Sequence, residues 1–553
     1  MAIDDYWFKN AVIYCLNVAT YMDCNGDGIG DFEGLSRRLD YLHGLGVTCV
    51  WLQPFYCSPN RDNGYDVSDF YSVSPRFGTS GDFVECMNHA QALGMRVIVD
   101  LVANHTSIDH PWFQSARSDP RSPYRDWYVW SERRPRGHAQ GTVFPPMQKT
   151  TWTRDSKAGK YYFHRFYEHQ PDLNTHHPAY RDELYRIMGY WLQLGVSGFR
   201  MDAVPFLVER KGANVKPVKD FALLQEMRRF LQWRARDAIL LAEANVPAAE
   251  SMDYFGDEGD RLQMMLNFPV NQRAFYAFAT SDARPIARAI TETAANIPRD
   301  AQWVNFLRSH DELDLGRLSD AQRKRVFRAF APDPSMQLYG RGIRRRLAPM
   351  LGNDRRRMEL AFSLLFSLPG TPMLQYGDEI GLGDDLALKE REATRTPMQW
   401  TGEPHGGFTR GKKAVLPVID DGVYGHQKVN VNAQRRDPDS FMNWMVRLIR
   451  VRKECMEIAW GRCDVLEGDA RSVLILFYRF RKAAMVTLHN FADHAQTVHL
   501  KVDDPGGARL VNLLNDEHSA AGRRGVHEVA LEPYGYRWYR VGAVDDTLVR
   551  EAF

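Results

Sequence analysis

Strand-like and helix-like segments alternate along most of the chain, and this alternation constrains the fold more than any other feature. Eight short apolar runs have the length and composition of buried strands, and each ends in a polar cluster. Between them lie segments such as residues 80–95 and 353–368, in which apolar residues recur with the helical period. Because eight parallel strands close a barrel, we expect an α/β fold of the (β/α)8 TIM-barrel type. The runs begin at Ala11, Val47, Arg96, Val196, Ala238, Leu262, Trp303 and Thr371.

Two interruptions of this alternation predict further domains. A long segment rich in Trp, Tyr, Pro, His and Arg separates the third run from the next helical segment. From residue 463 onward the chain consists of short β-patterned runs with turn residues between them, which is typical of an antiparallel domain. We therefore expect a barrel over 1–105 and 178–462, an inserted domain over 106–177, and a C-terminal β-sandwich domain over 463–553.

The charge balance and the cysteine pattern exclude several classes of function. The 71 Lys and Arg residues nearly balance the 69 Asp and Glu residues, so nothing favours nucleic acid or an anionic membrane as the main partner. No apolar stretch is long enough for a membrane span. The N-terminal sequence has no features of a signal peptide, so we expect a cytoplasmic protein. Seven scattered cysteines without a CxxC pair argue against a disulfide framework or a zinc site. We expect no organic cofactor, and the oligomeric state is left open.

Carboxylates follow three of the eight runs. Asp202 follows the fourth run, Glu243 the fifth and Asp311 the seventh. The carboxyl ends of barrel strands form the active face of this fold, so these three side chains should converge there. Burying several like charges costs free energy unless a function uses them. A pair of carboxyl groups of this kind carries out glycoside hydrolysis or transfer.

The local sequence assigns different roles to the three carboxylates. Arg200 lies two residues before Asp202, on the same side of a strand, and should keep Asp202 ionised as the nucleophile. An apolar run precedes Glu243 and should raise its pKa, which suits a general acid. Asp311 would hold substrate hydroxyls as positive charge develops on the sugar ring, with His310 donating to the same sugar.

These strand ends resemble the conserved regions of the alpha-amylase family of glycoside hydrolases, in both order and spacing. The resemblance implies that Asp202 is the nucleophile, Glu243 the acid/base and Asp311 the stabilising carboxylate of a reaction that retains the α configuration. The matching segments are residues 100–105, 198–202, 243 and 309–311.

Two histidines lie at the same strand ends. A lone histidine is more often a core residue. Because His105 and His310 both lie at strand ends beside carboxylates, we favour substrate contacts for them.

Other segments resemble the group within this family that acts on short α-glucosides, which includes oligo-1,6-glucosidases and trehalose synthases. Residues 61–66 are similar to the loop that closes the glucose pocket in that group. This implies that Tyr65 is a stacking platform and that Asp62 holds a distant hydroxyl, with Arg435 as the arginine that pairs with Asp62. The segments similar to trehalose synthases are residues 170–174, 381–400, 406–417 and 431–455.

Three functions remain open from the sequence. The first is a retaining enzyme on small α-glucosides that forms a covalent glucosyl–Asp202 intermediate and interconverts maltose and trehalose by intramolecular glucosyl transfer. The second is an α-glucosidase in which water intercepts the intermediate. The third is an inactive barrel that binds sugars. Trehalose synthases usually have Asn before the His-Asp pair and Ala-Asn-Gln-Trp after the acid/base, whereas this chain has Ser309 and, at 244–247, Ala-Asn-Val-Pro.

Oxygen-bearing side chains at alternate positions after the first run suit a hard cation such as calcium. The loop is not an EF-hand, because Gly34 stands where the bidentate glutamate would be. The alternative is a turn without metal, stabilised by its own Asp and Asn side chains. The resemblance to oligo-1,6-glucosidases and trehalose synthases implies a structural calcium. Its expected ligands are Asp23, Asn25, Asp27, Asp31 and the carbonyl of Ile29.

Overall fold

The computed structural model describes residues 3–213, 215–216, 218–295, 297–522 and 524–542. Each of the eight predicted runs supplies one strand of a closed barrel, so the predicted TIM barrel is confirmed. Every neighbouring pair of strands in the barrel is parallel. The strands are β1 (Ile13–Leu16), β2 (Cys49–Leu52), β5 (Arg96–Leu101), β9 (Gly198–Met201), β10 (Ile239–Ala242), β11 (Met264–Leu266), β12 (Gln302–Phe306) and β16 (Thr371–Gln375).

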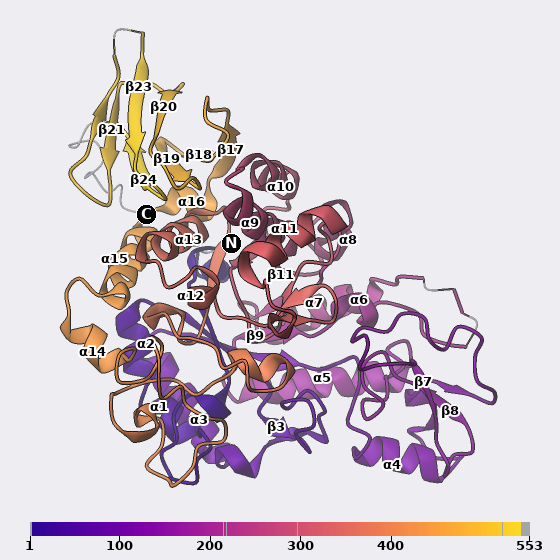
Figure 1. The fold of residues 1–553 in the computed structure, drawn as a ribbon. Coiled ribbons are helices and arrows are strands. Elements are labelled where there is room, and N and C mark those ends of the chain that lie inside the picture. The colour runs from indigo at the N-terminus through magenta and orange to yellow at the C-terminus, as the bar shows by residue number, and fades with distance from the viewer. Residues whose placement is uncertain (1–2, 214, 217, 296, 523, 543–553) are drawn as a thin grey trace.

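Helices surround the barrel (Figure 1). The helical segment that begins at Phe32 forms two helices, because Arg38 takes a non-helical backbone conformation (φ −108°, ψ 1°) between them. The longer helices are α2 (Leu39–Leu45), α3 (Ser80–Ala92), α5 (Pro178–Gln193), α7 (Ala222–Arg234), α8 (Ala248–Phe255), α9 (Phe268–Thr280), α10 (Arg284–Ala294), α11 (Asp320–Phe330), α13 (Arg355–Ser367) and α15 (Phe441–Glu454). The short helices are α1 (Phe32–Ser36), α6 (Val204–Leu207), α12 (Leu347–Met350), α14 (Val431–Arg436) and α16 (Met456–Trp460).

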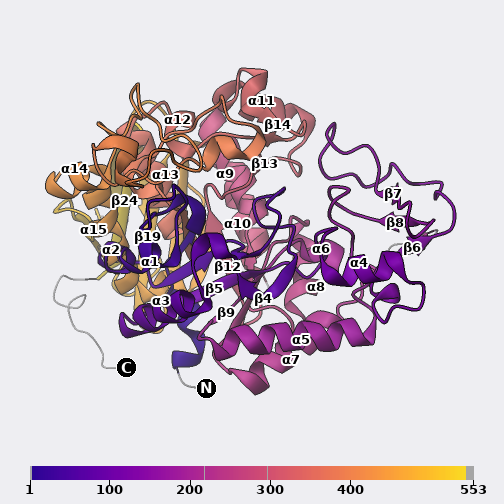
Figure 2. The same cartoon turned by 90° about the horizontal axis from the view of Figure 1, so that it is seen from below.

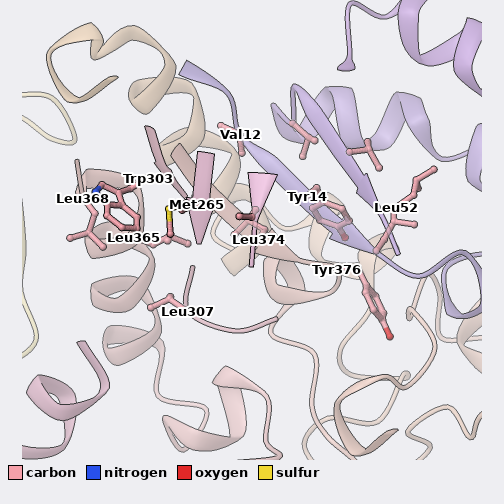
Figure 3. Packing of buried hydrophobic residues seen from close by; sticks show 14 of the residues in the cluster. Val12, Tyr14, Leu52, Met265, Trp303, Leu307, Leu365, Leu368, Leu374 and Tyr376 are labelled. Carbon is pink, nitrogen blue, oxygen red and sulfur yellow. The ribbon is translucent and has the colours of Figure 1, made fainter. Parts of the chain in front are cut away.

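Side chains alternate between the inside and the outside of the barrel, as the period of two in a strand requires. On β1, Ile13 and Cys15 belong to the cluster that fills the barrel, whereas Tyr14 and Leu16 pack outward against the helices. Figure 3 shows the outer layer, including Tyr14, Leu374 and Met265, between the strands and the surrounding segments. Both faces of each strand are therefore buried, which explains why the strands read as continuous apolar runs.

One glycine allows the two strands that precede Asp202 and Glu243 to approach each other. Gly198 opens β9 with φ +151°, and a Cβ atom there would lie 2.4 Å from the carbonyl oxygen of Ile239 on β10. A larger residue would force the strands apart.

The segment after β5 forms a small unit beside the barrel (Figures 1 and 2). It contains α4 (Pro111–Ser118) and a three-stranded sheet of β6 (Trp130–Ser131), β8 (Tyr161–Phe163) and β7 (Trp152–Arg154). Lys211 ties this segment to the barrel. Its Nζ lies 2.8 Å from Asp172 Oδ2 and donates to Asn104 Oδ1 at 2.6 Å and to the carbonyl of Leu173 at 3.1 Å. The ammonium thus joins the end of β5 to the far end of the insertion.

The C-terminal part is antiparallel, as expected. A six-stranded sheet and a two-stranded sheet share one apolar core, to which Phe477, Leu488, Leu500 and Leu531 contribute. The predicted limits of this domain and of the insertion stay predictions, and residues 543–553 lie outside the described residues. The strands are β17 (Arg462–Leu466), β18 (Val473–Phe480), β19 (Ala483–Asn490), β24 (Tyr536–Val541), β21 (Arg509–Asn512) and β22 (Ser519–Ala520) in the larger sheet, and β20 (Gln496–Lys501) and β23 (Val526–Leu531) in the smaller.

Two small antiparallel sheets lie outside the barrel. One pairs β3 (Tyr56–Cys57) with β4 (Asp69–Val73), and the other contains β13 (Leu313–Asp314), β15 (Gly342–Ile343) and β14 (Gln337–Leu338).

Among the helices of the described ranges, none has the length and apolar character that a membrane span requires.

Replacing Lys211 by Met should destabilise the protein strongly. The carboxylate of Asp172 is fully buried, and removing the ammonium leaves it without its counter-charge, a change that typically costs about 3–5 kcal/mol. Lys160→Met is the matched control, because its ion pair with Glu132 is exposed and such pairs contribute about 0–1 kcal/mol. Thermal unfolding followed by circular dichroism compares the two variants. Equal midpoints would contradict the assigned role of Lys211.

Candidate active site

A cavity of about 470 Å³ lies at the carboxyl ends of the barrel strands, within the size range of small-molecule sites. The structure brings eight of the nine predicted catalytic and substrate-binding residues to this cavity. Asp202 directly follows β9 and Glu243 directly follows β10, so their positions follow from the strands. Ala203, next to Asp202, has φ +50°, a conformation that is costly for a residue with a Cβ atom and that turns the chain out of the barrel. The eight residues are Asp62, Tyr65, His105, Arg200, Asp202, Glu243, His310 and Asp311.

Arg200 is the centre of the charged network. Its guanidinium is 1% exposed, and its Nη1 lies 2.5 Å from Asp100 Oδ1 and 2.7 Å from Asp202 Oδ1. Its Nη2 contacts Glu243 Oε2. Burial alone would lower the pKa of Arg200, but the surrounding carboxylates raise it well above the ordinary value, so the charge is permanent. Asp100 is a member of this network that was not predicted, and Trp51 holds it in place by donating to its Oδ2 at 2.8 Å.

Burial determines the protonation state of Glu243. Burial raises the pKa of Glu243 to about 8, and the nearby charge of Arg200 only partly opposes the shift. The carboxyl group is therefore mostly protonated at neutral pH and can donate a proton. This is the direction that the apolar run on β10 predicted, and the cause is the low polarity at the barrel mouth.

Asp311 has the opposite environment. Burial would raise the pKa of Asp311, but the guanidinium groups of Arg391 and Arg395, at 3.1 and 3.3 Å, hold it below its ordinary range. Burial lowers the pKa of His310 to about 3, so this imidazole is neutral. The hydroxyl of Tyr65 lies 2.7 Å from His310 Nε2, and the two rings are stacked 5.7 Å apart. The arrangement is an ionised carboxylate beside a neutral ring.

Asp62 lies at one end of the cavity, where Gln170 Nε2 donates to its Oδ2 at 2.9 Å. Burial raises the pKa of Asp62 to about 6, and the charges of Arg391 and Arg395 act in the opposite direction. These are the arginines near Asp62, and Arg435 is not. Arg435 is exposed on α14, and its carbonyl accepts a hydrogen bond from Asn443.

The correction has a physical reason. The segment after β16 folds back over the barrel mouth and carries Arg391 inward on a short 3-10 helix (Glu390–Thr394) and Arg395 directly after it, whereas α14 lies farther along the chain on the surface. The two arginines were visible in the sequence as a pair four residues apart within the stretch 381–400. Only the path of that loop identifies them as cavity residues.

The same cavity contains the two departures from the usual pattern. Ser309 and Val246 both line it, together with Phe166 and Phe206. Asn245 is held in place by Arg317, which donates to its carbonyl at 2.6 Å. His105 is buried, and its Nε2 lies 3.1 Å from the carbonyl oxygen of Tyr65.

The loop at 23–31 has the hydrogen bonds of a turn. Asp23 accepts from the backbone N–H groups of Gly26 and Gly28, and Asp31 accepts from those of Cys24, Asn25 and Gly34. Asn25 and Asp27 accept from backbone N–H groups within the loop. In the described part of the chain, no group of three or more His, Cys, Asp or Glu side chains is arranged to hold a metal ion. The geometry matches the alternative without metal, and calcium at Asp23, Asn25, Asp27, Ile29 and Asp31 stays a prediction.

Comparison with known proteins agrees with the resemblance. The model of the alpha amylase catalytic domain matches residues 16–331 and 343–461, and that of the sucrose hydrolase-like C-terminal domain matches residues 483–540. A protein named trehalose synthase/amylase TreS from Mycolicibacterium smegmatis is 40% identical over 557 residues, covering 98% of this chain and 94% of that protein.

Two further comparisons extend over nearly the whole chain. A protein named trehalose synthase from Thermus thermophilus is 41% identical over 551 residues, covering 99% of this chain, which spans 56% of the length of that relative. The crystal structure of an alpha-glucosyl transfer enzyme, XgtA, has a TM-score of 0.79 and 25% identity, and the match covers 97% of this chain and 99% of that one.

The raised pKa of Glu243 predicts the alkaline limb of the pH profile. A general acid works only when it is protonated, so kcat/KM for an α-glucoside should hold below pH 8 and halve near pH 8 as Glu243 loses its proton. Steady-state rates from pH 5 to pH 10 test this. Glu243→Gln should lose most activity on an α-glucoside with a sugar leaving group and keep more on an aryl glucoside whose phenolate leaves without protonation. An equal loss on both substrates would count against Glu243 as the proton donor.

Proposed function

The chain belongs to the alpha-amylase catalytic domain family, and we propose that it interconverts maltose and trehalose by moving a glucosyl group within one cavity. The observation that carries the glycosidic chemistry is the convergence on Arg200 of one carboxylate, Asp202, and one protonated carboxyl group, Glu243. These are the two groups that retaining glycoside cleavage needs. Identity of about 40% over nearly the full chain with proteins named trehalose synthase supports this substrate pair.

In the first step, Asp202 attacks the anomeric carbon of the non-reducing glucose of maltose. Glu243 donates its proton to the glycosidic oxygen, the bond from the anomeric carbon to that oxygen breaks, and glucose is released beside a glucosyl–Asp202 ester. Arg200 Nη1, which lies 2.7 Å from Asp202 Oδ1, holds the side chain of Asp202 in position for the attack. The Glu243 carboxylate that remains can now act as a base.

In the second step, the released glucose turns so that its own anomeric hydroxyl faces the ester. Glu243 takes the proton of that hydroxyl, and the hydroxyl oxygen attacks the anomeric carbon of the glucosyl group. The bond from that carbon to Asp202 breaks, which gives trehalose. Asp311 stabilises positive charge on the ring in both steps, because Arg391 and Arg395 keep it ionised. Asp62, Tyr65, His105 and His310 hold the glucosyl group, since all four line the cavity and are linked by contacts among Tyr65, Gln170 and the two histidines.

Hydrolysis is the second candidate. In an α-glucosidase, water would attack the same intermediate and both products would be glucose. The cavity position of Ser309 and Val246 favours this alternative, because both depart from the usual trehalose synthase pattern where the released glucose must turn. An inactive sugar-binding barrel fits less well, because a binding module has no use for a protonated Glu243 beside Asp202 and Asp311 in one cavity.

Incubation with maltose, and separately with trehalose, tests the proposed function. Chromatography of the sugars over time should show trehalose formed from maltose and maltose formed from trehalose, with glucose as a minor product. Asp202→Ala should lower both rates by roughly 10³-fold or more, because no ester can form. Asp40→Asn, an exposed change on α2, should leave them unchanged. Glucose as the sole product would assign the chain to the α-glucosidases.

A further inference from the structure

A second cavity lies behind Asp62. Its volume is about 770 Å³, and Asp62 and Arg391 line both this cavity and the active-site cavity. Met147, which is 61% exposed, and Lys389, also exposed, lie at its edge, so the second cavity is open to solvent. Where the two cavities share side chains, the wall between them is only one layer of side chains thick.

The rest of this wall is aromatic. Phe144 is its centre: its ring lies 4.8 Å from that of Tyr167, 4.9 Å from that of Tyr339 and 5.7 Å from that of Phe166. Phe144 and Phe166 line the active-site cavity, whereas Tyr167 and Tyr339 line the second cavity. We call these four residues the aromatic partition. The guanidinium of Arg391 covers the Phe144 ring at 4.9 Å and closes the partition on the side of Asp62.

The outer edge of the partition is fixed by polar contacts and by an unusual backbone. The hydroxyls of Tyr167 and Tyr339 both donate to Glu390 Oε2, at 3.3 and 3.2 Å. Tyr339 has φ +53° and Glu390 has φ +43°. Residues held in this region cost about 1–3 kcal/mol each and persist where the surrounding structure dictates them, which occurs often at functional sites.

The partition offers little to a water molecule that would cross it. Ring faces provide no strong hydrogen bonds, and transferring water into such a layer is unfavourable. The two polar side chains in the shared wall are already engaged, Asp62 by Gln170 and Arg391 by Asp311 and Glu312. The partition is therefore a barrier on the side of the active-site cavity that holds the glucosyl group.

We propose that the aromatic partition keeps water in the second cavity away from the glucosyl–Asp202 ester and thereby sets the ratio of transfer to hydrolysis. The inference rests on the proposed function. The step that the partition suppresses is hydrolysis of the ester. The oxygen of a water molecule attacks the anomeric carbon of the glucosyl group, and a proton of that water passes to Glu243. The bond from the anomeric carbon to Asp202 breaks, which gives free glucose. Tyr167 and Tyr339 thus determine specificity without touching the substrate.

Shortening the two tyrosine side chains that line the second cavity tests the proposal. Tyr339→Ala and Tyr167→Ala open the partition and leave every residue that lines the active-site cavity in place. With maltose as substrate, the ratio of glucose to trehalose should rise by roughly fivefold or more in each variant. Tyr185→Ala is the matched control, because Tyr185 is also a partly buried tyrosine that donates to a glutamate, Glu226, but it packs on Phe230 and lines neither cavity. Its ratio should equal that of the unaltered protein.

A second measurement separates this inference from the proposed function. The ester is trapped with 5-fluoro-α-D-glucosyl fluoride, excess reagent is removed, and the return of activity is followed in buffer with and without glucose. Opening the partition should speed reactivation in buffer alone and leave reactivation by glucose nearly unchanged, whichever product the unaltered protein favours. The sugars that the unaltered protein forms from maltose test the proposed function. The difference in reactivation rate between the unaltered protein and the variants tests the role of the partition.

Folded variants with an unchanged product ratio and an unchanged reactivation rate would overturn the proposal and leave the partition as ordinary packing. Circular dichroism confirms folding. If the alanine variants do not fold, Tyr339→Leu and Tyr167→Leu retain more of the packing while removing the ring and the hydroxyl, and the same two measurements then apply.

Discussion

The buried guanidinium of Arg200 is the interaction on which the rest of the active site depends. Several carboxyl groups taken out of water would repel one another and protonate unless a cation lay among them, and the forked geometry of arginine can serve more than one at once. The barrel supplies this arrangement through its register: Asp100 on β5 lies directly beside Arg200 on β9, and Glu243 follows the next strand, β10. Removing the arginine would therefore change the ionisation of every acid around it.

Environment, rather than residue type, divides the work among the carboxyl groups. Glu243 and Asp311 face the same cavity, yet burial dominates at Glu243 and raises its pKa, whereas two arginines dominate at Asp311 and lower its pKa. The cations that produce this difference come from two distant parts of the chain, Arg200 from a barrel strand and Arg391 with Arg395 from the loop after β16. Without that loop, Asp311 would lose both arginines that contact it.

The features that the sequence predicted correctly are the local ones. Eight strands could be found because both faces of each are buried, and Asp202 and Glu243 could be placed because each directly follows a strand. Asp100 was missed because its contact with Arg200 is set by the register of β5 and β9. The misplaced pairing of Arg435 and the unforeseen partner Arg391 depend instead on how loops fold over the barrel mouth. The same holds for Tyr339, whose contact with Phe144 joins segments separated by nearly two hundred residues. Nothing in the local pattern of either segment indicates the other.

The attachment of the inserted segment to the barrel has a consequence of its own. At this junction the cation among Asn104, Asp172 and Leu173 is the side chain of Lys211, covalently part of the protein. A bound ion stabilises a fold only to the extent that its free concentration exceeds its dissociation constant. An ammonium built into the chain has no such dependence, so dilution, dialysis and chelators leave this junction intact. Alkaline solution would remove its charge at a lower pH than that of an exposed lysine, since burial lowers the pKa of Lys211 below its ordinary value.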